Sequence, residues 1–124
     1  MRKRRGPNHS MDVEFLDEGM HLIVRPQGRM EAADGNFLTS AVEERLDAST
    51  TSVTIDLSEL DFVNFGGIRA MLRLGRSLRT SGKILDFARG SEEVRDVLDQ
   101  AGLDDLFPFT PPFNSNRGTN DETP

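Results

Sequence analysis

Residues 53–68 read VTIDLSELDFVNFGGI, and this stretch decides the fold. Its first part, Val53–Leu57, is a short β-rich run, which predicts a buried central strand. A helix is then predicted from about Gly67 to Arg79, because apolar residues recur there at helical spacing and a glycine follows at position 82. A buried strand that leads through a short loop into a helix is typical of α/β proteins.

The segments on either side repeat this alternation. Towards the N-terminus, two strands are predicted around Val13–Leu16 and at His21–Arg25, joined by a hairpin turn at Asp17–Gly19. Gly28–Glu31 then forms a turn that leads into a helical pattern from Phe37 to Leu46. The chain therefore begins with a hairpin and continues with a helix before it reaches the central strand.

Towards the C-terminus, Ile84–Phe87 predicts another strand, and Ser91 caps a third helix that ends at Gly102. Two strands followed by repeated helix–strand alternation imply right-handed crossover connections. The element order thus predicts an α/β sandwich, a mixed β-sheet of about four to five strands with about four helices packed against it.

Charge divides the chain in the same way as the apolar pattern. Residues 1–11 and 114–124 lack periodic apolar positions and are predicted to be disordered, which leaves residues 12–113 as one folded domain. The net charge of -6 at pH 7 combines +4 in the first ten residues, -1 in the last eleven and -9 between them. An acidic body repels nucleic acid and anionic membranes, so we expect neither as a partner. The basic segment is expected to be a solvated end, with an electrostatic tether as the alternative.

Other residue types exclude several classes of function. The chain has no cysteine, and no apolar run approaches the roughly 20 residues of a membrane-spanning helix. We therefore expect a cytoplasmic protein that does not insert into membranes. Only two histidines are present, the acidic pairs are adjacent in sequence and point apart, and neither a phosphate-binding loop nor metal-ligand spacing occurs. The sequence predicts no catalytic residue, no metal and no cofactor.

Several motifs become specific when their order is considered. They are Gly28-Arg29-Met30-Glu31, Val53-Thr54-Ile55-Asp56-Leu57-Ser58, Phe62-Val63-Asn64-Phe65-Gly66-Gly67-Ile68, Ser81-Gly82-Lys83 and the ending Ala101-Gly102-Leu103-Asp104-Asp105-Leu106-Phe107. In this order they resemble the STAS domain, which bacterial anti-sigma factor antagonists share with the cytoplasmic tails of sulfate transporters. The resemblance runs from about Val13 to Phe109 and implies the STAS-type sandwich for the folded domain.

One departure from the family pattern concerns phosphorylation. In the antagonists, the second serine of an Asp-Ser-Ser-Gly motif is phosphorylated by a partner kinase that also acts as the anti-sigma factor. That serine falls on Gly66 in this chain, and no residue from Asn64 to Gly67 carries a hydroxyl. Because phosphoryl transfer needs an oxygen nucleophile, the usual switch is predicted to be lost at this site.

The resemblance also implies a partner, an anti-sigma factor or serine kinase with an ATPase-like domain. The predicted partner-binding residues are Asn64, Phe65, Gly66, Gly67, Arg69, Arg73 and Arg76. The glycine pair would allow close approach, the phenylalanine would be an apolar anchor, and the arginines would form a positive stripe on one helix arc. Two alternatives stay open: the glycines only fit the strand-to-helix turn while Phe65 enters the core, and the arginines form a solvated face.

The sequence thus predicts a non-catalytic STAS regulator of sigma-factor activity that is not phosphorylated at Gly66. Two alternative functions stay open. One is a STAS subunit of a lipid-transporting ABC complex, although members of that branch typically keep a threonine or serine at the Gly66 position. The other is a sensory STAS module that holds a small ligand. A homodimer is likewise left open.

Overall fold

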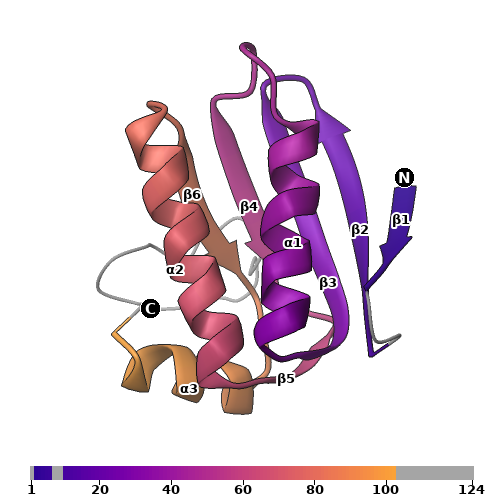
Figure 1. Cartoon of the computed structure of the whole chain (residues 1–124), viewed down its shortest axis with the longest axis vertical. Helices are drawn as coiled ribbons and strands as arrows, with labels where there is room; N and C mark the ends of the chain where they lie inside the picture. The colour runs from indigo at the N-terminus through magenta and orange to yellow at the C-terminus, as the bar shows by residue number, and fades with distance from the viewer. Residues whose placement is uncertain (1, 7–9, 103–124) are drawn as a thin grey trace, which may run out of the picture.

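The computed structural model describes residues 2–6 and 10–102 (Figure 1). Its strands are β1 (Arg2–Arg5), β2 (Met11–Glu18), β3 (His21–Met30), β4 (Ser52–Asp56), β5 (Leu60–Val63) and β6 (Ile84–Ala88). Its helices are α1 (Ala32–Arg45), α2 (Phe65–Thr80) and α3 (Glu92–Gln100). The predicted mixed α/β fold is confirmed. The described residues contain six strands and three helices, where the sequence predicted about four to five strands and about four helices.

The sheet is mixed, and its topology places the long helices together. The strands lie in the order β1-β2-β3-β4-β6, and β5 pairs with the last residues of β3. The first three strands are antiparallel, while β3 pairs in parallel with both β4 and β5, and β4 with β6. α1 connects β3 to β4, and α2 connects β5 to β6. These crossovers place both helices on the same face of the sheet, as Figure 1 shows.

The apolar core lies between this face of the sheet and the two helices. Strand side chains alternate between the two faces, so β2 buries Met11, Val13 and Phe15 against the helices. The inner side of α2 contributes Ile68, Met71, Leu74 and Leu78. Each fully buried aliphatic or aromatic side chain contributes roughly 1.5–3 kcal/mol relative to an exposed one. The apolar residues whose spacing predicted this helix therefore form its core-facing side.

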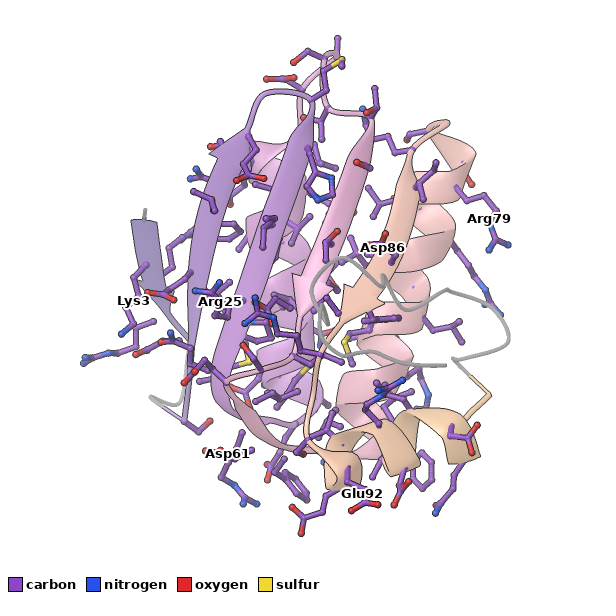
Figure 2. All side chains as sticks on the ribbon, turned by 180° about the vertical axis from the view of Figure 1, so that it is seen from behind. Lys3, Arg25, Asp61, Arg79, Asp86 and Glu92 are labelled. Carbon is purple, nitrogen blue, oxygen red and sulfur yellow. The ribbon has the colours of Figure 1, made fainter. Side chains whose placement is uncertain are left out.

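The opposite face of the sheet carries polar side chains that pair with one another (Figure 2). Arg25 Nε donates to Asp56 Oδ2 at 3.0 Å, and Arg25 Nη1 donates to Glu14 Oε1 at 3.3 Å. Burial disfavours the charged form of Arg25, but the hydrogen bonds and charges of Asp56 and Glu14 outweigh it and raise its pKa. The fully buried Asp56 also accepts the backbone N–H of Ser58 at 3.0 Å. In the Asp-Leu-Ser motif, Asp56 is thus the last residue of β4, and its buried carboxylate is paired with Arg25.

Gly28–Glu31, predicted as a turn, instead contributes its first three residues to the end of β3. Gly28 has a φ of +106°, and a Cβ at this position would clash with the carbonyl oxygen of Ser10. The register shifts between Gly28 and Arg29, where the strand begins to pair with β5. The sequence did not predict β5, because this strand has only four residues and depends on its pairing with β3.

Residues 2–5 and Met11 lie in strands, although they belong to the segment 1–11 that was predicted to be disordered. β1 is an edge strand on β2, and Met11 is 1% exposed at the start of β2. Lys3 and Arg5 each lie 3.7 Å from Asp12, and Arg4 lies 2.7 Å from Glu44 of α1. The basic residues thus have acidic neighbours from other segments, which local composition does not reveal. The predicted domain end at residue 113 and the tail 114–124 lie outside the described residues.

α1 and α2 approach each other through glycine and alanine. A Cβ at Gly35 would lie 2.6 Å from the Cβ of Ala70 and 3.2 Å from the Cα of Gly67. A Cβ at Gly66 would lie 2.7 Å from the Cβ of Ala32. Such separations are far below the van der Waals contact of roughly 3.5–4.0 Å between carbon atoms. This helix–helix contact therefore requires glycine at positions 35 and 66.

We expect Gly35→Ala to lower the free energy of unfolding by about 1–3 kcal/mol, the usual cost of overpacking. This loss should appear although alanine is roughly 1 kcal/mol the better helix former. Urea unfolding followed by circular dichroism measures the difference. Ser40→Ala, at an exposed position of the same helix, is the control and should change stability by no more than about 0.5 kcal/mol. Unchanged stability of Gly35→Ala would contradict the close contact.

Candidate functional site

Asn64 joins the end of β5 to the start of α2. Its backbone is extended (φ -104°, ψ 179°), and its side-chain Oδ1 accepts the backbone N–H of Gly67 at 2.9 Å. This is the geometry of an N-cap, which satisfies one of the N–H groups that the first turn leaves without a helical partner. The helix begins at Phe65, two residues before the predicted start at Gly67. We refer to residues 64–67 as the first-turn site.

Phe65 points away from the core. Its side chain is 62% exposed, and only two other large apolar side chains in the described residues are comparably exposed, Met20 and Ile84. The alternative in which Phe65 enters the core is therefore wrong. An exposed aromatic ring at a helix start is available for contact with another molecule, because burying it there removes a large apolar surface from water.

The two glycines of the first-turn site serve the packing of α2. Gly66 is half-buried against α1, and Gly67 is buried. A Cβ at Gly67 would lie 2.8 Å from the carbonyl oxygen of Met30 and 2.9 Å from Cγ2 of Val63. The structure thus supports the interpretation that the pair fits the strand-to-helix turn. Gly67 contributes its backbone N–H to the cap, while Gly66 lets α1 come close.

Arg69, Arg73 and Arg76 are all exposed on the outer side of α2, and we call them the arginine stripe. Arg73 Nη2 donates to Asn36 Oδ1 of α1 at 2.6 Å, so this arginine also ties the two helices together. The stripe starts two residues after the first-turn site and continues along the helix. Its exposure agrees with a solvated face and equally with a docking surface, because both need the guanidinium groups in solvent.

Phe62 lies next to the first-turn site and was not among the predicted site residues. The guanidinium carbon of Arg29 lies 4.2 Å from the centre of its ring, within the range of a cation–π contact. Arg29 Nη2 also lies 3.8 Å from Glu31. Arg29 and Phe62 are partners in the pairing of β3 with β5, so only the sheet register brings them together. One feature of the sequence indicated that Phe62 belongs to the site, namely an aromatic residue two positions before the N-cap.

The described residues of this site carry side chains that suit contacts with another molecule. Within it, no group of three or more histidine, aspartate or glutamate side chains could hold a metal ion. No described helix is long and apolar enough to cross a membrane. What the site does present is an exposed aromatic ring, a row of guanidinium groups and a tightly packed helix start.

This arrangement of sheet, helices and first turn belongs to a known family. The model of the STAS domain matches residues 11–117, which includes every helix described above and the first-turn site. The chain therefore belongs to the STAS domain family, as the order of its motifs predicted.

Within the family, the chain resembles anti-sigma factor antagonists. It is 29% identical over 91 residues, 73% of this chain and 78% of the relative, to a Bordetella bronchiseptica protein with the provisional name anti-sigma factor antagonist BtrV. An anti-sigma factor antagonist from Mycobacterium paratuberculosis has the same fold, with a TM-score of 0.72 and 20% identity over 86% of this chain and 90% of that one. The antagonist SpoIIAA in its unphosphorylated form gives a TM-score of 0.67 and 13% identity, covering 86% and 99% of the two chains.

We expect Asn64→Ala to lower the free energy of unfolding by about 1 kcal/mol, because the N–H of Gly67 loses its acceptor. Asn64→Ser is the matched variant, since serine caps helices about as well as asparagine. Its stability should stay within about 0.5 kcal/mol of the original chain. Equal stability of the alanine and serine variants in urea titrations would show that the cap contributes nothing.

Proposed function

We propose that this protein is a non-catalytic, cytoplasmic regulator of the anti-sigma factor antagonist type. It binds an anti-sigma factor or serine kinase with an ATPase-like domain through the first-turn site and the arginine stripe. The similarity to known antagonists supports this class of partner. The observation that carries the proposal is the exposure of Phe65 at the start of α2. By occupying the anti-sigma factor, such a protein releases a sigma factor for transcription.

The chemistry of the proposed surface suits protein binding. Aromatic and arginine side chains are enriched in the residues that dominate binding energy, and this surface has Phe65 followed by Arg69, Arg73 and Arg76. The stripe is positive on a body that carries a charge of -9 between residues 11 and 113. A local field of opposite sign orients an approaching partner, so we infer that the partner presents an acidic patch to α2.

We further propose that phosphorylation does not control this protein at the usual position. The N-cap and the next three residues are asparagine, phenylalanine and two glycines, which have no hydroxyl to accept a phosphoryl group. A phosphate would add about -1.5 to -2 charges at the start of α2. Without that charge, binding depends on how much of the protein and its partner is present. The protein is then a constitutive antagonist or a competitor of a phosphorylatable relative.

We expect no phosphate on residues 58–68 after incubation with the cognate kinase and ATP, followed by mass mapping of the peptides. A phosphorylatable antagonist in the same reaction is the control for kinase activity, and co-elution of the kinase with this chain confirms that the two meet. Phosphate on any residue of this segment, including the exposed Ser58, would refute the lost switch.

We expect Phe65→Ala to weaken binding to the cognate anti-sigma factor about tenfold or more in calorimetric titration, as loss of an apolar anchor does. Stability should change by no more than about 0.5 kcal/mol, because the ring is exposed in the free chain. Met20→Ala removes an equally exposed side chain in the β2–β3 turn and is the matched control. If both variants bind like the original chain, the first-turn site lies outside the interface.

A further inference from the structure

A cleft lies between β5 and α3, beside the first-turn site. Its lining residues are Asp61, Phe62, Val63, Glu93, Val94 and Val97, and its volume is about 200 Å³. The larger part of the lining is apolar, from the aromatic ring and three valines. A cavity of roughly 150 Å³ between apolar side chains holds a benzene molecule, so this cleft has room for one apolar side chain.

The mouth of the cleft is acidic. Asp61 and Glu93 line it from opposite walls, one from β5 and one from α3, and both are exposed. Figure 2 places Asp61 and Glu92 at the same end of the molecule. Glu59 and Asp96 of the adjoining segments are also exposed. Among the basic residues, Arg95 lies on α3, and Arg29 of β3 stacks on Phe62 and lies 3.8 Å from Glu31.

The cleft is continuous with the first-turn site along the chain. Val63 lines the cleft and is the last residue of β5, Asn64 is the cap, and Phe65 is exposed immediately after it. Consecutive residues span at most about 3.6 Å each, so a molecule that covers Phe65 reaches the cleft within a few residues. The charges on the two sides of Phe65 differ in sign, positive along α2 and negative around the cleft.

We propose that the β5–α3 cleft binds a segment of the protein partner in which an apolar side chain is flanked by lysine or arginine. The apolar side chain enters between Phe62, Val94 and Val97, and the flanking cations lie against Asp61 and Glu93. This inference rests on the proposed function, because it assigns a second contact to the same partner. Opposite charges on the two sides of Phe65 favour one orientation of the partner, since the reversed one brings like charges together.

The experiment uses two capped peptides and needs no anti-sigma factor. The ¹⁵N-labelled chain is titrated by NMR with acetyl-Gly-Arg-Leu-Leu-Lys-Gly-amide and, separately, with acetyl-Gly-Glu-Leu-Leu-Glu-Gly-amide. We expect the basic peptide to move the amide signals of Phe62, Val63, Val94 and Val97, and the acidic peptide to bind about fivefold more weakly or not at all. Equal shifts from both peptides, or shifts elsewhere, would overturn the proposal.

Two charge reversals on α3 provide the matched test. Glu93→Lys, on the wall of the cleft, should weaken the basic peptide about two- to fivefold. Asp99→Lys changes the net charge equally on an exposed position that does not line the cleft, and should leave the affinity unchanged. Equal affinity of both variants contradicts a role for Glu93. Shifts of the same signals with chain concentration and no peptide would show a second copy in the cleft, which also overturns the proposal.

The outcomes separate this inference from the proposed function. A chain that binds its anti-sigma factor but shows no preference for the basic peptide keeps the function and loses the cleft contact. A chain that binds the basic peptide but no anti-sigma factor loses the function, and the cleft then has a different basic partner.

Discussion

The contact between α1 and α2 is the constraint on which the rest of the structure depends. At Gly35 and Gly66 the two helices lie so close that a Cβ on either glycine would clash with an alanine of the facing helix. Asn64 caps the start of α2. The two glycines pack inward, and the ring of Phe65, which lies between the cap and the glycines, is exposed. A packing requirement between helices thus decides which side chain the start of α2 presents to solvent.

Sequence periodicity was sufficient for the elements whose signal is local. The central strand at residues 53–57 and the helix after it follow from apolar spacing, and the ordered motifs identified the family. β1 and β5 could not be predicted in this way, because each depends on residues far away in the chain. β1 pairs with β2 and its basic side chains lie near Asp12 and Glu44, and β5 pairs with the end of β3. Tertiary pairing, rather than propensity, makes these short segments strands.

The order of the motifs located the candidate site but did not show which of its residues face the core. The sequence left open whether the first turn faces a partner or the core, and the structure divides the answer between neighbours, with Phe65 outside and Gly67 inside. The cleft beside it could not be predicted, since Phe62 and Val97 line one cleft only because α3 packs against β5. Surfaces assembled from distant segments need the fold before they can be recognised.

Gly66 also limits which substitutions the chain can accept at the start of α2. A single mutation to serine would place the new Cβ 2.7 Å from that of Ala32, whose position is set by the first turn of α1. A serine at position 66 therefore needs a second, compensating substitution that makes room, and the variant with only one change is less stable. Any change at position 66 is thus tied to the residue that faces it on α1.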